Sequence, residues 1–164
     1  MLKTSAQWLS KHDDRAWTIF SLSVLTAVAA WFYLPARAGT GGHFPIPLDD
    51  TYIYFGYARS WALGHPFEWA PGNGYSSGAT AVLYPLILAP AWLLGLRGSS
   101  LGYMAALVAI AGMFDLCRCL RRAVPSRGSW LFAPVMVLVP VLDWSWLSGM
   151  ELGLFAALLG RSVL

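Results

Sequence analysis

The sequence predicts an all-α fold, a polytopic bundle of transmembrane helices with one long outer loop that contains juxtamembrane helices. Of the 164 residues 57% are hydrophobic and only 12% are charged, whereas soluble domains contain about a quarter charged residues. Nine tryptophans and seven tyrosines add rings of the kind that gather at membrane interfaces. The net charge of +3 is small and scattered, so we expect no nucleic-acid partner.

Residues 16–34 form the first predicted span, because they contain no charged side chain and about 20 apolar residues cross a hydrocarbon layer ~30 Å thick. A cleavable signal peptide is the alternative, since small residues surround Arg37, although the apolar region of such peptides is only ~7 to 15 residues long. Basic residues precede the span, which predicts a cytoplasmic N-terminus under the positive-inside rule.

Residues 79–96 are apolar but contain Pro85 and Pro90, so they form either a full span or a juxtamembrane or re-entrant helix. A full span would place the arginine cluster at 118–127 outside, against the positive-inside rule. We therefore assign residues 35–98 to the outer loop.

The rest of the chain is expected to continue the same single membrane domain, residues 1–164. We predict a second span at 99–120, a third at 129–146 and the start of a further span at 151–164. The last apolar run is shorter than the ~20 residues that a span needs. We therefore interpret the chain as the N-terminal portion of a longer protein.

Several polar residues near the predicted spans have structural interpretations. Cys117 and Cys119 lack the further ligands that a zinc site needs, and we expect them to be inert. Asp115 can pair with Arg118 one turn away. Asp143, beside two tryptophans, is expected at the membrane interface with its carboxylate reaching water.

The outer loop holds an acidic pair, Asp49 and Asp50, directly before an aromatic-rich segment, residues 51–61, that is expected to form a helix. One interpretation is helix capping, which a single Asp provides and which contributes about 1 kcal/mol. The other is chemistry, because adjacent carboxylates raise each other's proton affinity or bind a divalent cation such as Mg²⁺ or Mn²⁺. Both effects suit the deprotonation of a hydroxyl.

Three other places carry candidate functional residues. Arg59, on the same predicted helix, meets an anionic group at the membrane surface or is simply solvated. Tyr75, Ser76 and Ser77 end a run of turn residues that holds a polar ligand or is a plain connector. Glu151 opens the helix after the third span, where capping explains it as well as catalysis does.

Ordered motifs in residues 47–86 resemble the first outer loop of GT-C glycosyltransferases. After Pro47 and Leu48 they read, in chain order, DDTYIYFGYAR, GHPFEWAPG, SGAT and LYPL. The later SGMEL of residues 148–152 is similar to the S-G-L-E-T element that opens a subsequent helix in that family, with two of its letters changed. Together the motifs cover most of residues 17–160.

The resemblance implies an inverting transferase that moves a sugar from a polyprenyl-phosphate donor to a hydroxyl of a glycan, lipid or protein acceptor. The reaction takes place on the outer face of a membrane, here expected to be the bacterial inner (plasma) membrane, in cell-envelope synthesis. Asp49 or Asp50 then serves as general base or metal ligand and Glu151 completes the site. Arg59, Tyr52 and the Tyr75, Ser76 and Ser77 group are the expected substrate-binding residues.

A second class of function remains open. The chain is then a small non-catalytic multi-span membrane protein that acts as an assembly or interaction partner, and its acidic pair only caps a helix. The family uses many further spans to bind its lipid donor, so we expect residues 1–164 to be inactive as a transferase by themselves.

Overall fold

The computed structural model describes the backbone of residues 2–163, and their side chains from Asp13 onward. These residues contain helices and no strand, which confirms the all-α prediction. The helices are, in chain order, α1 (Leu2–Gly39), α2 (Thr51–Ala62), α3 (Leu83–Leu93), η1 (Gly98–Leu101), α4 (Gly102–Ala123), η2 (Arg127–Leu131), α5 (Phe132–Leu138), α6 (Pro140–Leu147) and α7 (Leu152–Val163).

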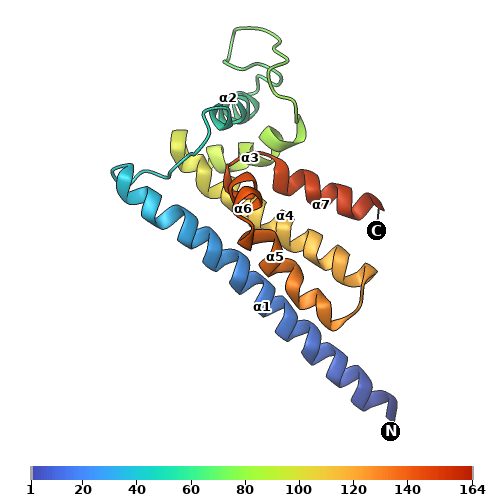
Figure 1. Ribbon diagram of the computed structural model, residues 1–164. Coiled ribbons are helices and arrows are strands. Elements are labelled where there is room, and N and C mark those ends of the chain that lie inside the picture. The colour runs from blue at the N-terminus through green and yellow to red at the C-terminus, as the bar shows by residue number, and fades with distance from the viewer. Residues whose placement is uncertain (1, 164) are drawn as a thin grey trace.

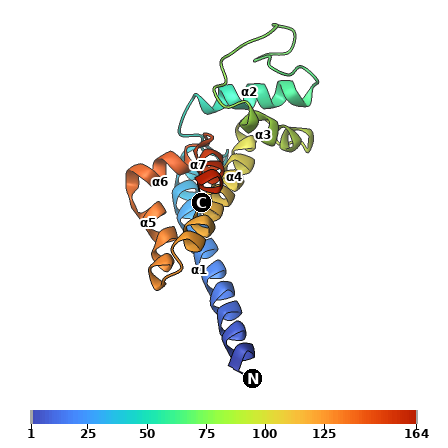
Figure 2. The same cartoon turned by 90° about the vertical axis from the view of Figure 1, so that its right-hand side faces the viewer.

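Two helical segments, Asp13–Gly39 and Gly98–Ala123, are long and apolar enough to cross a membrane. They contain the stretches predicted as the first and second spans. Figure 1 shows α1 running from the N-terminus toward the end of the molecule that carries α2 and α3, and α4 returning from that end. In the view of Figure 2, α2 and α3 lie across the direction of the long helices.

The helix α3 covers only part of the apolar stretch 79–96. Its 11 residues extend about 16 Å at 1.5 Å per residue, about half of a hydrocarbon layer. The helix packs on α2 through a buried cluster that includes Tyr54, Phe55, Tyr84 and Leu88. This packing explains why an apolar helix lies beside α2 instead of continuing as a long span.

The stretch 129–146 is not one continuous helix. It is divided among η2, α5 and α6, and the segments Arg127–Leu138 and Pro140–Leu147 are bent by 76° at the break. Val139, between them, has an extended backbone (φ −95°, ψ 109°), because Pro140 disfavours the helical conformation in the residue before it and lacks an N–H to continue the helix. Counted as one bent span, the pair would be a third candidate crossing.

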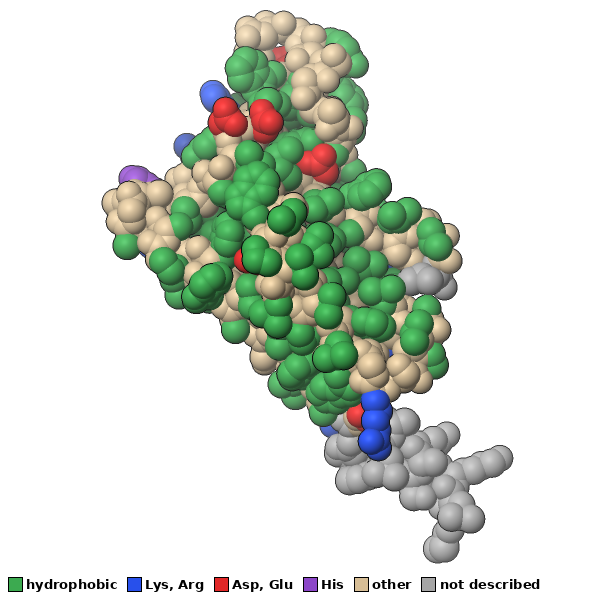
Figure 3. Space-filling model, viewed as in Figure 1, with side chains coloured by type: hydrophobic (Ala, Val, Ile, Leu, Met, Phe, Trp, Pro, Cys, Tyr) green, Lys and Arg blue, Asp and Glu red, His purple; other side chains and the backbone are tan. Residues whose placement is uncertain are grey.

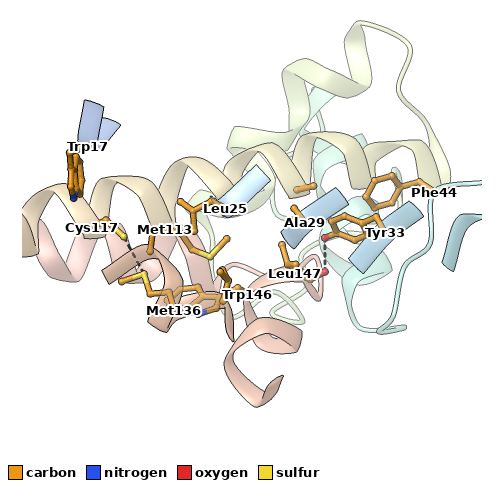
Figure 4. Close-up of a cluster of buried hydrophobic side chains, with 13 residues drawn as sticks. Trp17, Leu25, Ala29, Tyr33, Phe44, Met113, Cys117, Met136, Trp146 and Leu147 are labelled. Atoms are coloured by element: carbon orange, nitrogen blue, oxygen red, sulfur yellow. Dashed lines mark hydrogen bonds between the residues drawn. The ribbon is translucent and has the colours of Figure 1, made fainter. Parts of the chain in front are cut away.

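The main core lies between α1, α4, α5 and α6. Leu25, Met113 and Cys117 are fully buried there, and Figure 4 shows the Cys117 thiol directed toward Met136, with Sγ and Sδ 3.5 Å apart. Both cysteines are free and buried, as the inert interpretation expects. A buried free cysteine packs as a small apolar side chain, so its burial requires no functional explanation.

Small residues let α4 and α7 touch backbone to backbone. A Cβ at Gly153 would lie 2.8 Å from the Ala109 Cα, and a Cβ at Gly112 would collide with the Gly153 carbonyl group. Farther along, a Cβ at Gly160 would meet the Leu116 side chain at 2.8 Å. Contact partners thus advance together along both helices, so α7 runs parallel to α4. Small residues that let two helix backbones touch are typical of helix pairs in membranes.

The close α4–α7 contact changes the expected partner of Asp115. The carboxylate binds Arg161 of α7 through two hydrogen bonds, 2.6 Å from Nε and 2.8 Å from Nη2. Arg118 instead lies over the Phe114 ring, 5.9 Å from its centroid. The expectation of an intrahelical pair was wrong because α7 brings a guanidinium that can bind both carboxylate oxygens.

Asp143 does not reach the surface. Its side chain is 7% exposed and its Oδ1 atom has no hydrogen-bond partner among the described residues. Trp146 and Leu147, three and four positions later on α6, are buried as well. The three therefore share the inward face of α6, because the bend before Pro140 turns that face to the core, and the expectation that this carboxylate reaches water was wrong.

Candidate functional site

Three hydroxyl groups from three helices hold the backbone that joins α6 to α7. Each donates to the carbonyl of one of three successive residues: Tyr33 to Leu147 at 2.6 Å, Thr51 to Ser148 at 3.1 Å, and Tyr84 to Gly149 at 2.7 Å. Buried carbonyl groups require such partners. The junction is therefore fixed by α1, α2 and α3 together, and we call residues 147–149 the clamped segment.

Gly149 meets α2 at very close range. Its φ of +88° lies in the left-handed region, and a Cβ there would be 2.9 Å from the Thr51 Cγ2 atom. Glycine is required on both counts. Because Thr51 follows the acidic pair directly, this contact and the hydrogen bond from Thr51 to Ser148, 97 residues later, bring together two parts of the proposed motif set.

The acidic pair lies at the N-terminus of α2 but makes no side-chain capping bond to it. Asp50 is the N-cap residue and has a helical backbone (φ −54°, ψ −27°). The Asp49 Oδ1 atom accepts the N–H of Asp50 at 3.0 Å, which is a local contact outside the helix. Both side chains are exposed, so their carboxylates face water or a ligand at the positive end of the helix dipole.

Glu151 lies in a cavity of about 580 Å³. Its walls come from Leu48, before the acidic pair, from the start of α3, and from the α6–α7 region. The Glu151 Oε2 atom is buried and has no hydrogen-bond partner among the described residues. A mostly apolar cavity with few polar groups is the usual form of a small-molecule or lipid site, and an unpaired buried carboxylate oxygen is expensive unless a ligand or water satisfies it.

Tyr54 and Thr80 form the polar side of the same region, with their hydroxyl oxygens 2.9 Å apart. Burial raises the pKa of Tyr54, and the nearby Glu151 carboxylate raises it further. Burial likewise raises the pKa of Tyr84. Both phenols therefore stay protonated at neutral pH, and each keeps a hydroxyl proton to donate.

The predicted substrate-binding residues fall outside the Glu151 cavity. Tyr52 and Arg59 are exposed on α2, and the Tyr52 ring packs edge-on against Phe55. Neither side chain lines the cavity. Arg59 therefore lies on the open surface of α2, a position that fits both of its alternatives.

Tyr75, Ser76 and Ser77 line a separate hollow of about 90 Å³ beside α2. The Tyr57 hydroxyl donates to Ser76 Oγ at 2.7 Å and accepts the Gly78 N–H at 2.9 Å. Tyr75 itself is 81% exposed. The loop before α3 is therefore tied to α2, and Ser76 is held in place by protein contacts, whereas Ser77 is exposed.

The acidic pair supplies two carboxylates for a cation and no more. Among residues with described side chains, no group of three or more His, Cys, Asp or Glu side chains is arranged to hold a metal ion. Mg²⁺ is often bound by one or two carboxylates together with substrate phosphates and water. The pair fits a cation shared with a phosphate ligand, and does not form a closed metal cage.

Besides Tyr33, four site residues escaped the motif-based prediction: Thr51, Tyr54, Thr80 and Tyr84. Thr51 and Tyr84 hold the clamped segment, Thr80 lines the Glu151 cavity, and Tyr54 contacts Thr80. All four stand inside the motifs DDTYIY, SGAT and LYPL. Their position inside those motifs, close to the predicted acids, is therefore the sequence feature that could have identified them.

Comparisons with protein-family models, with curated proteins and with solved structures found no match to this chain. The functional conclusion therefore depends on the geometry of the site and on the motifs themselves.

Proposed function

We propose that this chain is the N-terminal part of an inverting membrane glycosyltransferase of the GT-C type. It moves a sugar from a polyprenyl-phosphate donor to an acceptor hydroxyl on the outer face of the membrane. The observation that carries the proposal is the Thr51–Ser148 hydrogen bond with the tight Thr51–Gly149 contact. These contacts join the acidic-pair motif to the SGMEL motif, as a shared active site requires.

The proposal includes a polytopic arrangement in which residues 35–98 form an outer loop at headgroup depth. The crosswise direction of α2 and α3 in Figure 2 supports it, since helices on a membrane surface lie across the spans. On the face in Figure 3, a broad hydrophobic surface lies between charged side chains near α2 and charged side chains near the N-terminal end. An apolar surface between two charged ends agrees with helices that cross a membrane.

In the proposed reaction, Asp49 or Asp50 accepts the proton of the acceptor hydroxyl. The resulting oxygen nucleophile forms a bond to the anomeric carbon while the bond from that carbon to the donor phosphate oxygen breaks, and the phosphate leaves with the electron pair. Glu151 and the protonated Tyr54 bind sugar hydroxyls and orient the donor. A divalent cation shared between the acidic pair and the phosphate would offset the negative charge of the leaving group.

The test is sugar transfer from a radiolabelled polyprenyl-phosphate sugar in membranes that contain the full natural reading frame around these residues. We expect Asp49→Asn or Asp50→Asn to lower the rate on the order of 100-fold or more, the usual share of a general base. Glu68→Gln is the matched control, because Glu68 lies in the neighbouring connection between α2 and α3, binds the Gly72 N–H at 2.6 Å and does not line the cavity.

Equal activity of both Asn variants and the control would refute the site assignment. Absence of any transfer by the unaltered protein across lipid-linked donors, with intact insertion, would favour the non-catalytic assembly partner.

A further inference from the structure

A second large cavity, of about 970 Å³, lies at the end of the molecule far from α2. It is enclosed by the start of the Asp13–Gly39 segment, the last turns of α4 and the η2 region. Arginine and tryptophan side chains dominate its walls: Arg118, Arg121, Arg122, Arg127, Trp17 and Trp130. No step of the proposed transfer reaction uses this cavity.

Arg121 is an anchored part of the wall. Its guanidinium binds Asp13 at 2.7 Å and Asp14 at 2.9 Å, and its carbon Cζ lies 4.8 Å from the centroid of the Trp17 ring. The Trp17 indole N–H in turn donates to the Ser129 carbonyl at 3.1 Å. These contacts join α1, α4 and η2, and they pair both acidic residues of the cavity wall, Asp13 and Asp14, with Arg121.

The other three arginines, Arg118, Arg122 and Arg127, form no ion pair within 4 Å among the described residues. Asp115, which is paired with Arg161 and does not line the cavity, is the acid that interacts with Arg118 and Arg122 at longer range. The segment before Asp13 contains no Asp or Glu. Four arginines against two aspartates leave a formal surplus of two positive charges on the walls. The helix dipole explains arginines in the last turns of α4, but Arg127 belongs to η2 and faces the same cavity.

The cavity lies at headgroup depth if the two long helices span the membrane, because both candidate spans end beside it, at Asp13 and at Ala123. Tryptophan rings are enriched at that depth. The positive-inside rule explains arginines near a span, but it requires neither a cavity nor aromatic walls. The combination of free guanidinium groups, indole rings and interface depth fits a molecule with an anionic head and an apolar body.

We propose that this cavity binds the phosphate headgroup of an anionic membrane lipid. Guanidinium groups match phosphate oxygens with paired hydrogen bonds, and basic pockets between spans are suited to anionic headgroups. The half-buried Trp130 ring packs against the glycerol and upper acyl region, where an amphipathic ring has both an apolar face and a polar edge. Trp17 is only 2% exposed and holds Arg121 in place from within the core.

Native mass spectrometry of the purified full chain in a nonionic detergent tests the proposal. The probes are phosphatidylglycerol and phosphatidylcholine with identical acyl chains. We expect selective retention of phosphatidylglycerol, and retention on the order of tenfold weaker in Arg118→Gln/Arg122→Gln. The matched control, Arg37→Gln/Arg97→Gln, removes the same charge near the other end of the long helices and should bind as the unaltered protein does.

A second variant, Arg118→Lys/Arg122→Lys, preserves the charge that sets insertion and removes the planar fork, so we expect an intermediate loss. Equal retention of the two lipids by the unaltered protein would overturn the proposal, and so would undiminished binding by the folded Gln variant. Displacement of the lipid by millimolar inorganic phosphate that also raises the melting temperature without lipid would assign the cavity to a soluble phosphate compound instead.

Discussion

Tyr33, Thr51 and Tyr84 each put one hydroxyl on an otherwise apolar helix face. The sequence marks the two tyrosines only as aromatic residues in apolar surroundings, where a ring packs and its hydroxyl seeks any partner. In the structure the partners are the consecutive carbonyl groups of the clamped segment. Their role is thus to fix the register of the α6–α7 junction against the first three helices.

Tyr84→Phe should therefore destabilise the protein by about 1–3 kcal/mol, because the Gly149 carbonyl is left buried without its donor. Tyr103→Phe is the matched control, since Tyr103 is 44% exposed and contacts the Phe44 ring through its own ring. Thermal unfolding in detergent, followed by circular dichroism, measures both. Equal melting temperatures for the two variants would contradict the assigned role of the hydroxyl.

The candidate acids could be predicted from sequence, and their surroundings could not. Asp49, Asp50 and Glu151 stand out because acids are rare in this chain and each precedes a helix. The pairing of Tyr54 with Thr80 joins residues from separate motifs, and neither helical periodicity nor local turn patterns encode such long-range contacts. The burial of Asp143 was missed for the same reason.

The positions of α1, α2 and α4 follow from the predicted stretches 16–34, 51–61 and 99–120, although α1 extends well beyond the first of them, from Leu2 to Gly39. The region around Pro140 does not, because residues 129–146 have the length and composition of one span while the structure bends by 76°. Proline was the available signal. What the sequence does not reveal is the direction of the bend, which depends on how the inward face of α6 packs on the core.

The α4–α7 contact depends on the absence of a side chain at Gly112. We expect Gly112→Leu to destabilise the protein by about 1–3 kcal/mol or more, because its side chain would collide with the backbone of Gly153. Ala111→Leu, at the adjacent exposed position, adds a large side chain without that collision. Melting temperatures in the same detergent compare them, and an equal effect of both would argue against the close helix contact.

At the scale of the whole molecule, the elements that line the Glu151 cavity and those that line the arginine-walled cavity lie toward opposite ends of the long helices (Figure 1). If α1 and α4 span the membrane, Ser77 and Ser126 lie on opposite sides of it. Ser77→Cys should react with an impermeant maleimide added outside intact cells, while Ser126→Cys should react only after permeabilisation. Both serines are exposed, whereas the native cysteines are buried, so the background is low. Labelling of both from one side would contradict the topology.

The clamped segment forms late during synthesis of the chain. Its three hydroxyl donors emerge from the ribosome long before the carbonyl groups that receive them. Until then the hydroxyl groups of Tyr33, Thr51 and Tyr84 must donate their hydrogen bonds to water or to one another. The three hydroxyl groups therefore obtain their carbonyl partners only after Gly149 has been synthesised, later than contacts such as Tyr57–Ser76 and Arg121–Asp13, whose residues all come earlier in the chain.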